Sequence, residues 1–161
     1  MSACLLLGSN EEPRNEWLAK ARVEIGVWCG QICRESEVYE TAPWGFEADT
    51  SFLNQALLLE TTLSPSDLLK KCLQIEKSLG RIRNNNQERY HSRNIDIDLL
   101  LYEDTICESQ ELTIPHPRLH LRPFALNPID EILPYWVHPV FGFTAKEMIE
   151  FIEKCVTLQK R

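Results

Sequence analysis

The chain has 161 residues, of which 43% are hydrophobic and 25% charged, and its formal net charge is −7. This length and composition predict one soluble domain, residues 1–161, and exclude a disordered or membrane-spanning chain. The acidic balance disfavours general binding to nucleic acid or to anionic membranes. The start, MSACLLLGSN, lacks the basic and long apolar regions of a secretory signal, so we expect a cytoplasmic protein.

The first half of the chain predicts a strand, a helix and two further strands. The apolar run ACLLLG, ending at Gly8, is typical of a central strand. Apolar residues spaced three and four apart then predict a helix over residues 13–28. The stretches 31–40 and 51–62 predict two strands, and the connector TAPWGFEADT carries aromatic residues that suggest a binding loop.

The segment LSPSDLLKKCLQIEKSLG predicts a second helix with clear ends. Ser64 is a suitable N-cap, Pro65 suits the first helical position, and Asp67 complements the helix dipole. Gly80 is a typical C-terminal stop. The apolar spacing leaves Glu76 near the helix end, beside an arginine-rich segment.

The second half adds one long strand, two short ones and a last helix. The long strand is expected over residues 92–102, and shorter signals lie around 104–107 and 111–114. Thr144 and Glu147 form a capping box at the start of the last helix. The order strand, helix, strand, strand, helix, strand predicts an α+β, ferredoxin-like fold with helices packed on one face of an antiparallel sheet.

Six cysteines are scattered along the chain with no CxxC pair, which favours buried free thiols over disulfides or a zinc site. They are Cys4, Cys29, Cys33, Cys72, Cys107 and Cys155.

Two aspartates interrupt the apolar strand SRNIDIDLLLY. Asp96 and Asp98 are two residues apart, so their side chains leave the same face of a strand, roughly 6.5–7 Å apart. Paired carboxylates suit Mg²⁺ that also binds substrate phosphates, and six of the ten arginines lie between residues 81 and 122, where they could hold those phosphates. The pattern predicts a metal–nucleotide site. Aspartates facing water on an edge strand, with ordinary surface arginines, are the alternative.

A histidine between two prolines is a second candidate. The prolines of TIPHPR stiffen the backbone around His116 and orient its imidazole. His120 lies four residues on, but Pro117 disfavours a helical zinc pair. We interpret His116 as a donor to a phosphate, with a turn histidine of no function as the alternative.

The stretches TAPWG and FLNQ supply a proline, aromatic rings and Asn54. Rings stack on flat ligands, and an Asn amide offers both a donor and an acceptor. These residues therefore indicate a pocket for a flat, amide-rich ligand, with core packing of Phe52 as the alternative.

The segment RYHSRNIDIDLLLY resembles the signature of the 6-hydroxymethyl-7,8-dihydropterin pyrophosphokinase family, although His91 and Ser92 replace its usual Gly-Pro. Further landmarks of that family follow in order over residues 5–134: LGSN, YETAPWG, FLNQAL, IEKSLGRIR, LTIPHPR and RPFALNPIDEILP. The resemblance implies transfer of pyrophosphate from ATP to the pterin, with release of AMP, in folate biosynthesis.

The resemblance also implies the residues of the site. As catalytic residues it implies Arg81, Arg83, Arg93, Asp96 and Asp98, of which Asp96 and Asp98 would bind two Mg²⁺ ions. For ATP it implies Glu76, Arg93, His116 and Arg122. For the pterin it implies Thr41, Pro43, Trp44, Phe52, Asn54 and Phe124. Three active-site loops would correspond to residues 8–15, 43–50 and 81–92, and we expect a monomer.

Two other classes of function remain open. A nucleotidyl transferase or cyclase would also use two metal-binding aspartates on a ferredoxin-like sheet, but it has no need of the pterin-like pocket. A non-catalytic nucleotide-binding module would explain neither that pocket nor the paired carboxylates.

Overall fold

The structure is a computed structural model, and it describes residues 1–42, 50–80 and 94–159. Its strands are β1 Ser2–Ser9, β2 Gln31–Glu35, β3 Tyr39–Thr41, β4 Phe52–Glu60, β5 Asp96–Tyr102, β6 Cys107–Glu108 and β7 Thr113–Ile114. Its helices are α1 Arg14–Trp28, α2 Pro65–Ser78, α3 Pro123–Ile132 and α4 Ala145–Gln159, with a 3₁₀ turn, η1, at Leu119–Leu121.

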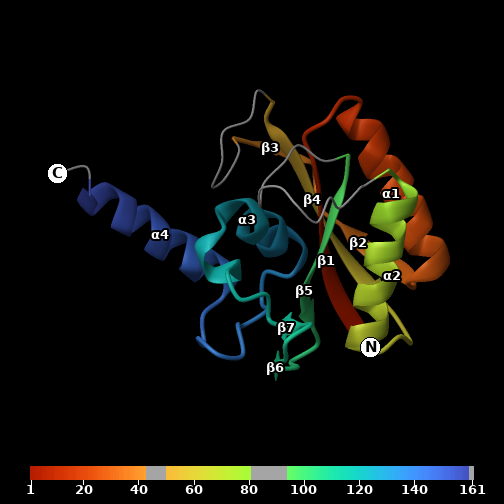
Figure 1. The fold of residues 1–161 in the computed structure, drawn as a ribbon. Coiled ribbons are helices and arrows are strands. Elements are labelled where there is room, and N and C mark those ends of the chain that lie inside the picture. The colour runs from red at the N-terminus through yellow and green to blue at the C-terminus, as the bar shows by residue number, and fades with distance from the viewer. Residues whose placement is uncertain (43–49, 81–93, 160–161) are drawn as a thin grey trace.

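The main sheet is antiparallel in the order β2-β4-β1-β5, and β3 pairs with the other end of β4 (Figure 1). This order confirms the predicted ferredoxin-like fold, with the apolar β1 at its centre. The stretch predicted as one strand over 31–40 is two strands. Between them the Ser36 hydroxyl accepts the N–H of Ala56 at 2.9 Å and so replaces a backbone partner in the ladder.

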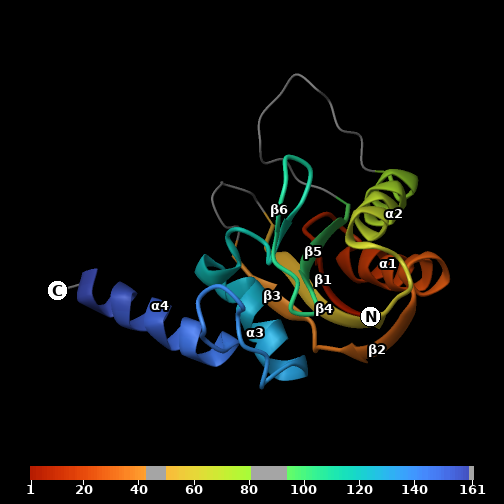
Figure 2. The ribbon, with the colours of Figure 1, turned by 90° about the horizontal axis from the view of Figure 1, so that it is seen from below.

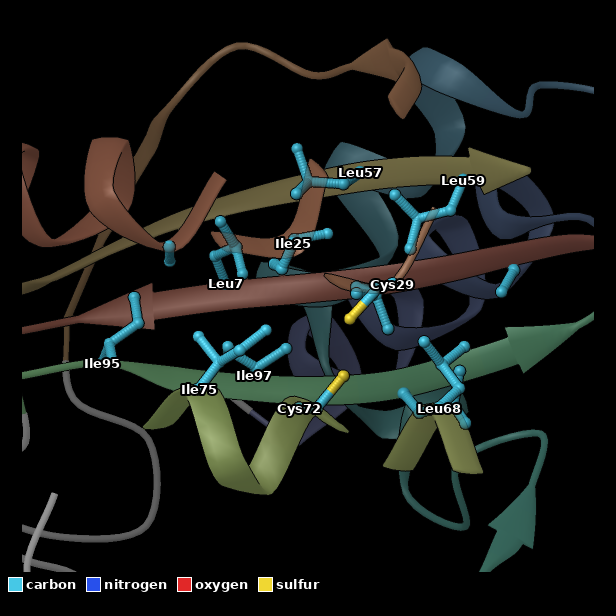
Figure 3. Packing of buried hydrophobic residues seen from close by; sticks show 14 of the residues in the cluster. Leu7, Ile25, Cys29, Leu57, Leu59, Leu68, Cys72, Ile75, Ile95 and Ile97 are labelled. Atoms are coloured by element: carbon cyan, nitrogen blue, oxygen red, sulfur yellow. The ribbon is translucent and has the colours of Figure 1, made fainter. Parts of the chain in front are cut away.

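Helices α1 and α2 pack side by side on one face of the sheet, as Figure 2 shows. Leu57 of β4 and Ile97 of β5 meet Ile25 of α1 in a buried cluster. Figure 3 shows Cys29 and Cys72 pointing toward one another within this cluster. The Cys29 thiol and burial raise the pKa of Cys72, so its thiol stays neutral.

The opposite face carries a second core, which corrects the expectation that helices pack on one face only. Leu6 of β1 and Leu100 of β5 pack there against Leu126 and Ile129 of α3. Helix α3 is absent from the elements predicted for the second half of the chain, which held only one last helix. The main sheet therefore lies between two helical layers.

Both predicted helix caps are present. Ser64 Oγ accepts the N–H of Asp67 at 3.2 Å at the start of α2, and Thr144 and Glu147 exchange hydrogen bonds at the start of α4. The far end of α4 leads away from the sheet in both ribbon views (Figures 1 and 2). In the part of the chain that the structure describes, no helix combines the length and apolar character that a membrane crossing requires.

Candidate active site

The two aspartates of β5 lie where the strand begins. Ile97 and Leu99 point into the core under α1 and α2. Because side chains alternate along a strand, Asp96 and Asp98 point to the opposite face, and both are half-buried. They pair across the sheet with Gly8 and Leu6 of β1. The predicted pairing of the carboxylates on one face is confirmed.

Glu76 of α2 lies at the edge of the same strand. Its side chain is buried, and its carboxylate accepts the backbone N–H of Ile97 at 2.8 Å. Since β5 is an edge strand, this N–H points out of the sheet and needs such a partner. Glu76 therefore anchors the residue that separates Asp96 from Asp98.

A pocket of ≈ 290 Å³ opens beside this edge. Leu69 and Leu73 of α2 and Leu112, just before β7, form apolar walls, while Asp98 and His116 add polar groups. An apolar slot with carboxylates at one end can hold the flat base of a ligand whose charged part extends toward the aspartates.

His116 lies in the same pocket, immediately before Pro117. Its backbone N–H donates to Leu100 O at 2.8 Å, and its Nδ1 accepts the N–H of Arg118 at 3.2 Å. Burial lowers the pKa of His116 to about 4, with smaller contributions from Arg122 and Arg118. The imidazole is therefore neutral at pH 7, and its other nitrogen, Nε2, carries the proton and can donate it in a hydrogen bond.

Arg122 connects the aspartates to the start of α3. Its guanidinium lies 4.0 Å from Asp98 Oδ2 and 5.6 Å from the centre of the Phe124 ring. The Arg122 side chain is only 14% exposed, so this positive charge is held in place at the site. The structure thus brings together Asp98, Arg122 and Phe124, which the family resemblance assigned to the metal, ATP and pterin parts of the site.

The residues expected to bind the pterin adjoin the aspartates. Asn54 of β4 is buried, and its Nδ2 donates to Thr41 Oγ1 at 2.8 Å. A Cβ built on Gly8 would lie 3.3 Å from Asn54 Oδ1, 3.8 Å from the Phe52 ring and 3.9 Å from Asp96 Cβ. These groups therefore form one surface beside Asp96, and Gly8 allows their close approach.

Other predicted residues lie outside the described part of the chain, and no position is assigned to them: Pro43, Trp44, Arg81, Arg83 and Arg93. The described residues that flank 81–93 do adjoin the site. Asn94 Nδ2 donates to Leu79 O at 3.1 Å, and Ser9 Oγ donates to Asn94 O at the end of β1. This holds the end of α2 and the approach to β5 next to Asp96.

Asp96 and Asp98 are the residues best suited to hold a metal ion. Among the described residues, no group of three or more His, Cys, Asp or Glu side chains could ligate one. Two carboxylates suit Mg²⁺, which usually keeps water and takes further oxygen ligands from substrate phosphates. The donor set therefore fits Mg²⁺ that arrives with a phosphate-bearing ligand.

Residues 4–134 match the family model described as 7,8-dihydro-6-hydroxymethylpterin-pyrophosphokinase (HPPK). A 2-amino-4-hydroxy-6-hydroxymethyldihydropteridine pyrophosphokinase of Porphyromonas gingivalis is 40% identical over 136 residues, which cover 84% of this chain and 92% of that protein. The enzyme of the same name from Aquifex aeolicus is 38% identical over 141 residues, covering 88% of this chain and 86% of that protein.

A solved Plasmodium falciparum HPPK-DHPS structure shares the fold with a TM-score of 0.75, at 17% identity. The match covers 99% of this chain but 43% of that longer chain, so this chain spans less than half of it. The family model and the two bacterial enzymes cover most of this chain. The chain belongs to the 7,8-dihydro-6-hydroxymethylpterin-pyrophosphokinase family.

Proposed function

We infer that this protein is a 2-amino-4-hydroxy-6-hydroxymethyldihydropteridine pyrophosphokinase of folate biosynthesis. It transfers pyrophosphate from ATP to the hydroxymethyl group of 6-hydroxymethyl-7,8-dihydropterin and releases AMP. Beyond family membership, the observation that carries this proposal is the place of Asp96 and Asp98. They lie between an apolar pocket on one side and the surface of Thr41, Phe52 and Asn54 on the other.

The pocket between α2 and the β6–β7 hairpin suits the adenine of ATP. Leu69, Leu73 and Leu112 offer apolar walls to a flat base, and residues 109–113 of the hairpin line the pocket. Glu76 keeps β5 fixed behind the base through its bond to Ile97. ATP bound there would extend its phosphates past Asp98.

His116 and Arg122 are proposed to bind these phosphates. Neutral His116 donates one hydrogen bond without bringing a second charge, and Arg122 supplies the positive charge and a planar pair of donors. Arg81, Arg83 and Arg93 are proposed to add phosphate contacts, as their motif positions imply. Asp96 and Asp98 are proposed to hold two Mg²⁺ ions, which when bound would neutralise phosphate charge and orient the acceptor oxygen.

The pterin is proposed to lie on the surface next to Asp96. Its amide-like edge would face the buried Asn54 side chain, and Thr41 fixes the orientation of that side chain. Phe52 and Phe124 offer ring faces, and Pro43 and Trp44 are proposed to complete the enclosure. The hydroxymethyl group would then point toward the aspartates.

Catalysis in this arrangement rests on positioning and electrostatics. Transfer of a phosphoryl group requires the acceptor oxygen, the phosphorus and the leaving oxygen to lie in line, with charge stabilised at the equatorial oxygens. Arg122 and His116 hold those oxygens, and Asn54 holds the acceptor. None of these residues needs to act as a strong base.

Separation of nucleotides after incubation with ATP, Mg²⁺ and the pterin tests the proposal. We expect AMP to form in step with pterin diphosphate, and no nucleotide to be consumed when the pterin is omitted. Pterin-independent ADP would indicate an ATPase, and cyclic AMP would indicate a cyclase. Either product in place of AMP would contradict the proposal.

A further inference from the structure

Arg14, the first residue of α1, joins three segments of the chain beside the proposed pterin surface. Its Nε donates to Glu12 Oε1 at 2.8 Å. One terminal nitrogen donates to Glu40 Oε1 of β3 and to both the backbone oxygen and the hydroxyl of Ser51, each at 3.0 Å. Ser51 in turn donates its hydroxyl to Glu40. The guanidinium is therefore the centre of a polar cluster, and its side chain is only 19% exposed.

This cluster holds the two strands that carry the pterin surface. Glu40 is next to Thr41, and Ser51 is next to Phe52, which pairs with Thr41 across β3 and β4. Nearby, the Thr50 hydroxyl donates to the backbone oxygen of Asn10, two residues beyond Gly8. The ends of β1, β3 and β4 are thus joined where Gly8, Phe52 and Asn54 meet.

The energetic role of Arg14 follows from exposure. Glu12 and Glu40 are 68% and 58% exposed, and ion pairs in such surroundings contribute little to folding. The two bonds to Ser51 instead fix the backbone at the start of β4 in one place. By fixing this backbone, Arg14 acts on the shape of the neighbouring surface.

We propose that Arg14 is a positioning residue for the pterin, and this rests on the function proposed above. By holding Ser51 against Glu40, Arg14 keeps Phe52 and Thr41 at the spacing that directs the Asn54 amide toward the ligand. Arg14 touches neither substrate. Its loss therefore weakens pterin binding and leaves the ATP pocket on the far side of Asp98 unchanged.

Arg22 provides a matched control on the same helix. It also joins α1 to β4, with its Nη1 donating to Gln55 Oε1 at 2.7 Å, and its Nε pairs with Glu35 Oε2 of β2 at 3.5 Å. Gln55 points toward α1, away from the face that carries Asn54, because the two are adjacent in a strand. Arg22→Ala removes a comparable guanidinium contact without disturbing Ser51.

The test measures binding of 6-hydroxymethylpterin to the protein saturated with Mg²⁺ and α,β-methylene ATP, and binding of that analogue alone. We expect Arg14→Ala to weaken pterin binding about tenfold, which corresponds to about 1.4 kcal/mol, and to change the affinity for the analogue less than twofold. Arg14→Lys keeps the positive charge and one donor nitrogen, and it should give an intermediate loss of pterin affinity. Arg22→Ala should change neither affinity more than twofold.

Steady-state kinetics should show the same division, with KM for the pterin raised by Arg14→Ala and KM for ATP unchanged. Equal losses for both substrates, or a pterin loss equalled by Arg22→Ala, would mean that Arg14 supports only the fold and would overturn the inference. If the wild-type protein turns over the pterin and Arg14→Ala binds the pterin with normal affinity, the inference is overturned and the proposed function stands. A wild-type protein that binds no pterin would overturn both.

Discussion

At the scale of single residues, Asp96 and Asp98 carry the proposed reaction. Replacing either aspartate with Asn would remove a charged metal ligand. We therefore expect turnover to fall on the order of a thousandfold in each variant. The melting temperature of Asp96→Asn without ligands should not fall, because removing one of two neighbouring like charges relieves repulsion, whereas Asp98→Asn also removes the carboxylate that lies beside Arg122. Steady-state rates and thermal melts measure the two effects, and near-normal turnover in either variant would contradict the metal role.

His116 makes a prediction about pH. Its pKa is lowered by burial to about 4 in the folded protein, against about 6.5 in an unfolded chain. Between these values the unfolded chain binds more protons, so the contribution of His116 to stability falls as the pH drops below about 6.5 and is constant above about 7.

When the pH is lowered from 7.5 to 5.0, the free energy of unfolding should fall by about 1–2 kcal/mol more in the wild-type protein than in His116→Gln. Urea unfolding of both proteins at the two pH values measures it. The carboxylates that also titrate in this range are common to both proteins, so their contribution cancels. Identical pH dependence in the two proteins would show that His116 titrates normally.

At the scale of elements, the cap of α2 gives a direct test of how the helix is specified. Ser64→Ala removes the acceptor for the Asp67 N–H and should lower the free energy of unfolding by about 1 kcal/mol. Ser66→Ala, two residues further along the same exposed turn, should change it by less than about 0.5 kcal/mol. Denaturant titrations compare the two variants. Equal losses would show that the hydroxyl of Ser64 has no capping role.

Elements with local punctuation could be predicted from the sequence. Ser64 and Gly80 bound α2, and Thr144 with Glu147 starts α4, because caps act within a few residues. Helix α3 was missed because Pro123 and Pro128 read as breakers. Pro123 occupies the first helical position, and Pro128 is buried within α3, where burial offsets the one missing backbone bond.

The site was predictable where its residues are neighbours in sequence, as with Asp96 and Asp98. The contacts that span the fold were not. Glu76 lies near the helix end as expected, but the sequence did not predict that it accepts a hydrogen bond from Ile97, 21 residues away. Arg14 reaches Ser51 across 37 residues, and nothing local marks it. Such pairs depend on strand register, which the sequence specifies only through the whole sheet.

At the scale of the whole molecule, the six cysteines report on the packing of the fold. All are free thiols; Cys4, Cys29 and Cys72 are buried as predicted, whereas Cys33 and Cys155 are exposed, which corrects the expectation for those two. Burial raises the pKa of Cys4 to about 12, which suppresses its reactive thiolate.

An aromatic disulfide reagent should therefore modify two thiols rapidly in the native protein and all six after unfolding. Cys33→Ser and Cys155→Ser should each remove one rapid equivalent. Rapid reaction of four or more thiols in the native protein would contradict the burial of Cys4, Cys29 and Cys72 in the two cores. A single unfolding transition, and a sedimentation mass of one chain, would bear out the expected single domain and monomer.

The central claim concerns which phosphorus of ATP the pterin hydroxyl attacks. Simple kinases direct the acceptor to the γ-phosphorus and release ADP, whereas the proposed enzyme directs it to the β-phosphorus. ATP labelled with ³²P at the β position answers the question in one reaction with Mg²⁺ and the pterin. We predict that the label appears in pterin diphosphate and that AMP carries none. Label retained in ADP, with the pterin carrying a single phosphate, would contradict the account.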